Sequence, residues 1–154
     1  MKICVFSDSH GNSFYMKEMI RREKPDRIFF LGDGEQDLPA LRQAFPVLPI
    51  DAVRGNCDFR TELPRELVLT LEGVRFFLTH GHRYGVKTGD LETLKAAARE
   101  NRAQAVLFGH THEAFIGWDR ELLLMNPGTA RGYGASGGIL EIRAGRLLPR
   151  IEDL

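Results

Sequence analysis

Four short apolar runs in this sequence are each closely followed by residues that bind metal ions, and these four places hold all five histidines. Short apolar runs bounded by turn residues are typical of buried strands. Because strand ends lie along one edge of an open α/β sheet, where ligands usually bind, we expect these side chains to converge. The segments are Asp8-Ser9-His10, Gly32-Asp33, His80-Gly81-His82 and Gly109-His110-Thr111-His112, and a fifth, Gly55-Asn56-Cys57-Asp58, follows another apolar run.

Imidazoles, carboxylates and a carboxamide in one place predict a metal site, and their number indicates two ions. Asp8 and His10 stand two positions apart in an extended segment, so both can reach one ion. His110 and His112 have the same spacing, but the turn at Gly109 can direct them to different ions.

Asp33 and Asn56 supply the remaining oxygen ligands of the predicted site. Asp33 lies between two glycines, where its carboxylate can bridge ions about 3.5–4 Å apart. Asn56 offers a neutral oxygen, which adds coordination without repelling a phosphate. Taken singly, Asp33 also fits an ordinary turn, and Asn56 fits a left-handed turn better than a ligand position. The order and spacing of all five segments favour the metal site.

Composition predicts one domain spanning residues 1–154, since domains typically have about 100–200 residues. Basic and acidic residues balance at 21 each without blocks of like charge, which argues against a stable nucleic-acid partner but allows a small phosphate ester. We expect a cytoplasmic protein without membrane contact, because no secretory signal and no apolar stretch of about 20 residues is present. Cys4 and Cys57 are then free thiols, Cys4 packing inside a strand.

Strands and helices alternate in the first half of the chain, which favours parallel pairing. We predict strands at residues 3–6, 28–31 and 47–53, a helix from about Asn12 to Pro25, and a second helix that starts with Asp37 as N-cap and ends at Pro46. The second half predicts a hairpin of residues 67–72 and 74–79, a helix over 90–101, a strand over 105–108 and two more hairpins, 114–125 and 139–152. Residues 132–138 predict a mobile loop. Two mixed sheets packed face to face, with helices outside, fit this order.

The motifs resemble those of the calcineurin-like metallophosphoesterases over nearly the whole chain. The residues that carry the resemblance are Asp8-x-His10, Gly32-Asp33, Arg54-Gly55-Asn56-Cys57-Asp58, His80-Gly81, Gly109-His110-x-His112 and Asn126-Pro127-Gly128. The small single-domain branch of YfcE-type phosphodiesterases is the most similar.

The resemblance implies an α/β fold, a four-layer α/β/β/α sandwich of two mixed sheets, around two divalent metal ions. It implies that Asp8, His10 and His112 bind one ion, that Asn56, His80 and His110 bind the other, and that Asp33 bridges them. Nitrogen and oxygen ligands suit Mn, our first expectation, or Fe, Zn, Ni or Co. The activity implied is hydrolysis of phosphodiesters by in-line attack of a metal-bridging hydroxide.

Cys57 departs from the wider superfamily, in which a histidine at this position is thought to protonate the leaving group. Protonation of the leaving group is then left to water, to His82 or to no group. We therefore predict a preference for substrates with good leaving groups, such as aryl esters. Arg54, Asn56, Asp58 and His82 are the further candidates for contact with the substrate or the ligands. Arg54 and His82 also fit ordinary polar loop positions, and Asp58 also fits a role in orienting its loop.

Two other functions stay open on the sequence. A phosphomonoesterase or a nucleotide pyrophosphatase would use the same centre. A non-catalytic scaffold is possible because a eukaryotic retromer subunit resembles this fold, but a scaffold has no need of the seven matching ligands. Self-association is possible, and Phe14-Tyr15 or Trp118 would then mark a contact surface, although we expect these residues in the core.

Overall fold

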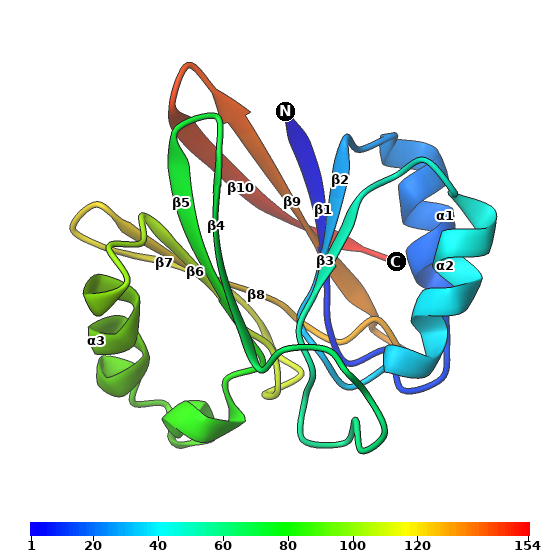
Figure 1. Ribbon diagram of the computed structural model, residues 1–154, viewed down its shortest axis with the longest axis horizontal. Helices are drawn as coiled ribbons and strands as arrows, with labels where there is room; N and C mark the ends of the chain where they lie inside the picture. Colours follow the sequence, from blue (N-terminus) through cyan, green and yellow to red (C-terminus); the bar gives the residue numbers. More distant parts are fainter.

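Two five-stranded mixed sheets pack face to face in the computed structural model, which describes residues 1–154 (Figure 1). The first sheet has the order β10-β9-β1-β2-β3. In it β1, β2 and β3 are parallel, whereas β9 is antiparallel to both β1 and β10. The strands are β1 (Lys2–Phe6), β2 (Arg27–Phe30), β3 (Ile50–Ala52), β9 (Ser136–Arg143) and β10 (Arg146–Asp153).

The second sheet has the order β4-β5-β6-β8-β7, with β5, β6 and β8 parallel and β4 and β7 antiparallel to their neighbours. Its strands are β4 (Glu66–Leu71), β5 (Val74–Thr79), β6 (Ala105–Leu107), β7 (Ala114–Asp119) and β8 (Leu122–Pro127). Helices α1 (Phe14–Glu23) and α2 (Leu38–Ala44) cover the outer face of the first sheet, and α3 (Glu92–Glu100) covers that of the second (Figure 1). None of these helices combines the length and the hydrophobicity needed to cross a bilayer.

Alternation along the strands decides which side chains form which layer, because successive residues of a strand point to opposite faces. In β1, Ile3 and Val5 enter the cluster between the sheets, whereas Cys4 and Phe6 pack under α1 and α2. Phe29 and Phe76 meet across the inner layer, with ring centroids 5.4 Å apart. The four-layer sandwich is thereby confirmed, and the prediction of a single domain, which no observation here tests, stays a prediction.

Three expectations about individual segments are wrong. The third strand is only residues 50–52, and Val47 is 94% exposed. Phe14 and Trp118 are exposed rather than in the core. The predicted loop at 132–138 ends early, because its last three residues begin β9. By contrast, Asp37 is the N-cap residue of α2 as predicted, although its carboxylate accepts hydrogen bonds from Ser9 Oγ and from the Gly11 N–H and makes no capping bond.

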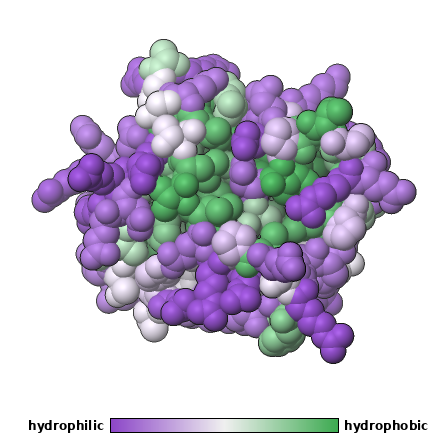
Figure 2. Space-filling view, viewed as in Figure 1, coloured by the Kyte–Doolittle hydropathy of each residue, from purple (hydrophilic) through white to green (hydrophobic).

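Apolar side chains are visible over the middle of the face shown in Figure 2, which is the side of the molecule where β3 and β4, edge strands of the two sheets, lie in Figure 1. Leu67, Leu69 and Leu71 of β4 are only partly buried there. The surrounding surface is mostly hydrophilic (Figure 2). Self-association of this chain stays a prediction.

The two cysteines lie in opposite environments, which predicts opposite reactivity. Cys4 is fully buried, and burial raises the pKa of its thiol to about 12, so it is neutral and inaccessible. Cys57 is exposed. Because the thiolate reacts with disulfide reagents, we expect the native protein to titrate as one thiol at pH 8 and the urea-unfolded protein as two. Two rapidly reacting thiols in the native protein would contradict the buried position of Cys4.

Candidate metal centre

The loops that follow five parallel strands meet at one edge of the two sheets, toward the bottom of Figure 1. Asp8 and His10 follow β1, Asp33 follows β2, and Asn56 follows β3. From the second sheet, His80 follows β5, and His110 and His112 follow β6. The convergence expected from the strand ends is therefore present, and three overlapping groups of ligand-type side chains result. Two of them consist wholly of predicted ligands, and the third, His10, Asp33 and Cys57, joins these two.

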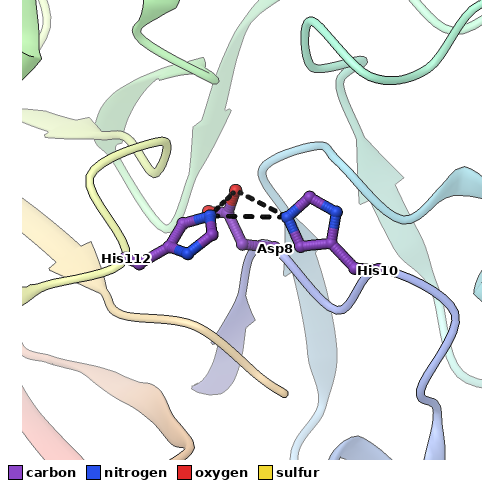
Figure 3. A group of neighbouring side chains, drawn as sticks. All are labelled: Asp8, His10 and His112. Carbon is purple, nitrogen blue, oxygen red and sulfur yellow. Dashed lines mark hydrogen bonds and ion pairs between the residues drawn. The ribbon is translucent and has the colours of Figure 1, made fainter. Parts of the chain in front are cut away.

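The first group consists of Asp8, His10 and His112, whose side chains point toward one another (Figure 3). His112 Nε2 lies 3.1 Å from Asp8 Oδ1 and 3.4 Å from His10 Nε2. His10 Nε2 lies 3.7 Å from Asp8 Oδ1. Asp8 is fully buried, whereas the two imidazoles reach the surface, so this group opens to solvent on the histidine side.

The second group consists of Asp33, His80 and His110. His80 Nε2 lies 3.2 Å from Asp33 Oδ2, and the ring centroids of His80 and His110 are 5.0 Å apart. The two groups adjoin, because His80 Nε2 is also 3.8 Å from Asp8 Oδ1. Asp33 and His80 are buried.

The tautomer of His80 indicates that a cation belongs between these residues. His80 Nδ1 lies 2.7 Å from the Leu31 carbonyl oxygen, and because a carbonyl can only accept, Nδ1 must carry the proton. Nε2 is then the nitrogen that faces Asp33 and Asp8, and it can bind a metal ion when the ring is neutral. His80 Nε2 and Asp8 Oδ1 are buried without any hydrogen-bond partner, which is costly unless a proton or a metal ion lies between them. The donor set therefore fits divalent cations.

Burial and nearby charges keep His110 and Asp33 of the second group in the protonation states that bind metal ions. Burial, with the nearby charge of His80, lowers the pKa of His110 to about 4, so its imidazole is neutral at pH 7. Burial alone would raise the pKa of Asp33, but the hydrogen bond and charge of His80, with the Cys57 N–H at 2.7 Å, lower it well below its usual range. Both side chains thus offer free lone pairs at neutral pH.

Most of the predicted ligands have a left-handed backbone conformation, which sets the direction of their side chains. Among the seven predicted ligands, five have positive φ: Asp8 55°, His10 45°, Asp33 57°, His110 69° and His112 63°. Non-glycine residues rarely adopt this conformation, which costs about 1–3 kcal/mol each and concentrates at functional sites. The surrounding hydrogen bonds therefore hold a strained arrangement in place.

Asp58 is the main support of the Asp33 loop. Its Oδ2 accepts from the N–H groups of Asp33 and Gly55, each at 2.8 Å, and its Oδ1 accepts from those of Gly34 and Glu35, each at 3.1 Å. The residue is 6% exposed. With both oxygens engaged and buried, Asp58 orients the loop, and contact of Asp58 with a substrate stays a prediction.

Ser7 and Asn126 hold the histidine loop, and sequence reasoning assigned neither of them a role. Ser7 Oγ donates to Asp8 Oδ2 at 2.6 Å, the same oxygen that accepts the His110 N–H at 3.0 Å. Asn126 Nδ2 donates to the Gly109 carbonyl and to Thr111 Oγ1, each at 3.0 Å, between the two histidines of this loop. The Asn126-Pro127-Gly128 motif was the only signal in the sequence.

The other residues predicted to contact the metal ions or the substrate form few interactions with the two ligand groups. Asn56 is exposed, and its carboxamide donates to Cys57 Sγ at 3.6 Å rather than meeting His80 or His110, so its place as a ligand stays a prediction. His82 is half-buried, with its ring 5.5 Å from that of His80, and burial lowers its pKa. The half-buried Arg54 forms no ion pair, and its backbone N–H donates to the Pro64 carbonyl.

Gly55 leaves the space that the Asp33 carboxylate occupies. A Cβ at Gly55 would lie 2.0 Å from Asp33 Oδ1, far inside contact distance. We expect Gly55→Ala to displace Asp33 and to weaken Mn²⁺ binding at least about tenfold in calorimetric titration, equivalent to about 1.4 kcal/mol. The control is Gly73→Ala in the β4–β5 hairpin, where a Cβ meets nothing within 4 Å, so that the only strain comes from the positive φ of 79° and Mn²⁺ affinity should not change. Equal Mn²⁺ affinity in Gly55→Ala and wild-type protein would contradict the proposed place of Asp33.

Comparison with known proteins agrees with this geometry. The family model described as the calcineurin-like phosphoesterase superfamily domain matches residues 1–144. A probable metallophosphoesterase of Bacillus subtilis, YsnB, is 32% identical over 85% of this chain and 76% of its own length. The phosphodiesterase YfcE of Escherichia coli K12 is 37% identical over 92% of this chain and 88% of its own.

A solved structure gives the same result. A conserved uncharacterized protein of Streptococcus pneumoniae TIGR4, a predicted phosphoesterase, superimposes with a TM-score of 0.81 and 30% identity, over 99% of this chain and 88% of that one. This chain therefore belongs to the calcineurin-like phosphoesterase superfamily, in its YfcE-type branch.

Proposed function

We propose that this chain is a metal-dependent phosphodiesterase that holds two divalent ions. The observation that carries the proposal is the junction of the two ligand groups, where His80 Nε2 faces both Asp33 and Asp8 without a donor between them. A single ion can use only one of these groups fully, whereas two ions use both. Relatives named as a metallophosphoesterase and a phosphodiesterase support the same activity.

Each residue has a defined part in the proposed centre. Asp8, His10 and His112 hold one ion, Asn56, His80 and His110 hold the other, and Asp33 is shared. Two bound cations would supply the chemistry of ester hydrolysis, since they would lower the pKa of a water and neutralise charge on the phosphate. Ser7, Asp58 and Asn126 keep the ligands in position through the hydrogen bonds described above. Mn²⁺ is the proposed ion, with Fe, Zn, Ni or Co as substitutes.

The leaving group of the substrate should matter strongly, because Cys57 stands where the wider superfamily has a histidine, and burial lowers the pKa of the nearby His82, which makes its ring a less available proton donor near neutral pH. Burial, with the charge of Asp33, raises the pKa of the Cys57 thiol, which makes it a still weaker acid. We therefore expect the rate on a series of aryl phosphodiesters to fall steeply as the pKa of the leaving phenol rises, with dialkyl diesters the slowest. Equal kcat/KM for aryl and dialkyl diesters would show that a general acid has been overlooked.

The alternatives differ from this proposal in what they predict. A monoesterase or a nucleotide pyrophosphatase has the same centre and differs only in the preferred substrate. A scaffold needs no strained ligand backbone, yet five of the seven predicted ligands have it here. A small phosphate ester as the substrate, a cytoplasmic location and the lack of a stable nucleic-acid partner stay predictions.

Hydrolysis by chelator-stripped protein, before and after addition of Mn²⁺, separates these functions. We expect Mn²⁺ to restore turnover of bis-p-nitrophenyl phosphate, with a higher kcat/KM than for the monoester p-nitrophenyl phosphate. A higher kcat/KM for the monoester would favour a monoesterase. A folded protein that binds Mn²⁺ and cleaves neither ester would leave the scaffold as the remaining candidate.

A further inference from the structure

A polar cavity of about 430 Å³ adjoins the first ligand group. It is lined by His10 and His112, whose imidazoles face each other across Asp8 in Figure 3, and by Thr129, Arg131 and Gly132 of the segment between β8 and β9. No apolar and no acidic side chain lines it. The cavity is therefore an opening through which a hydrophilic anion can reach the proposed ions.

Arg131 is the only charged side chain outside the ligand set that lines this cavity. Some arginines, such as Arg99, Arg143 and Arg150, are held by ion pairs with carboxylates at 2.5–3.0 Å, whereas others, such as Arg146, are not. Arg131 forms no ion pair and is exposed. A guanidinium without a carboxylate partner beside two histidines is available to bind an anion.

The backbone next to Arg131 is fixed to the loop after β1 that carries Asp8. Thr129 Oγ1 donates to the Asp8 carbonyl at 2.7 Å, and the Ala130 N–H donates to the Ser7 carbonyl at 2.9 Å. The Ser136 N–H closes the segment by donating to the Thr129 carbonyl at 2.9 Å. Arg131 thus has a defined starting point beside the centre, and only its side chain has to reach the substrate.

We propose that Arg131 binds a non-bridging phosphate oxygen of the substrate from the side of His10 and His112. The inference rests on the proposed function and adds a substrate-binding residue to it. A phosphodiester carries one negative charge spread over two such oxygens, and the planar guanidinium donates two parallel hydrogen bonds to this geometry. Lysine supplies the charge but not the two parallel N–H donors, so it should replace arginine only in part.

Kinetics on bis-p-nitrophenyl phosphate give the first test, with the Mn²⁺-loaded protein. We expect Arg131→Gln to raise KM at least about tenfold, as for loss of a hydrogen bond to a charged group, and Arg131→Lys to recover part of the loss. Mn²⁺ affinity should stay unchanged in both variants. Arg146→Gln, which removes an exposed arginine from the β9–β10 hairpin, should behave as wild type. An unchanged KM in Arg131→Gln would overturn the proposal.

Arginine labelling gives a second test that needs no turnover. We expect phenylglyoxal to modify Arg131 in the Mn²⁺-loaded protein. Inorganic phosphate at about 10 mM, a concentration on the order of the Kd of a weakly bound anion, should slow the modification of Arg131 but not that of Arg146. Equal rates at Arg131 with and without phosphate would overturn the proposal. If wild-type protein shows no turnover of any ester, the proposed function fails, and the labelling result still decides whether Arg131 binds phosphate.

Discussion

Asp33→Asn should abolish turnover while leaving the protein folded. The carboxylate lies within reach of both ligand groups, since Oδ2 is 3.2 Å from His80 Nε2 of the second group and the side chain also lies close to His10 of the first. Asparagine keeps the size but removes the charge that two neighbouring cations share. We expect kcat on bis-p-nitrophenyl phosphate to fall at least about 1,000-fold, equivalent to about 4 kcal/mol, when measured with saturating Mn²⁺.

Asp51→Asn is the matched control. Asp51 lies in β3, and its carboxylate pairs with Arg27 of β2 rather than with a predicted metal ligand. The Asp51→Asn variant should retain turnover within a few-fold. A rate for Asp33→Asn within about tenfold of wild type would mean that Asp33 is a turn residue and that the ligand groups act without a shared carboxylate.

Asp58→Asn should give the largest loss of stability among the substitutions near the centre. Replacing one carboxylate oxygen by an amide NH₂ leaves two of the four backbone N–H donors around it without an acceptor. Each buried donor left unpaired costs about 1–3 kcal/mol, so we expect a loss of about 2–6 kcal/mol in the free energy of unfolding. Urea unfolding followed by circular dichroism measures it, as a lower midpoint with an unchanged slope.

Asp26→Asn serves as the control for Asp58, since Asp26 is exposed and its carboxylate accepts one backbone N–H, that of Lys2. Its unfolding midpoint should move much less. Mn²⁺ should also bind more weakly to folded Asp58→Asn, because the Asp33 loop loses its support. Wild-type stability in Asp58→Asn would contradict this account, since it would show that the two N–H groups left without the carboxylate oxygen do not need it.

The place of the site was predictable from the sequence because it depends only on strand ends. Apolar runs that stop at Asp8, Asp33, His80 and His110 indicate both the strands and the edge where they finish. The layers follow from alternation, with Ile3 and Val5 on one face of β1 and Cys4 and Phe6 on the other.

Tertiary packing decided what the sequence could not show. The start of β9 reads as a loop because it is Ser136-Gly137-Gly138, yet these small residues are buried beneath large ones. A Cβ at Gly137 would lie 2.7 Å from Met19 Sδ, and one at Gly138 would lie 2.4 Å from Met125 Cε. Glycine is therefore present for close packing in a strand rather than for a turn.

The supports of the site were also beyond sequence reasoning. The four bonds of Asp58 join residues 23–25 positions away as well as Gly55, and Asn126 reaches Gly109 from 17 positions away. The left-handed backbone at His110 and His112 depends on such contacts, because a non-glycine residue does not adopt it by local preference. Exposure of Phe14 follows from its place as the first residue of α1, beyond the faces that pack.

Titration of chelator-stripped protein with Mn²⁺, with the rate on bis-p-nitrophenyl phosphate measured at each level of bound metal, tests the two-ion centre most directly. We predict two bound ions per chain and turnover that appears only as the second ion binds. His112→Ala and His110→Ala, each altering one ligand group, should bind one ion tightly and lack activity. Full turnover with a single ion, or turnover without any metal, would contradict the account.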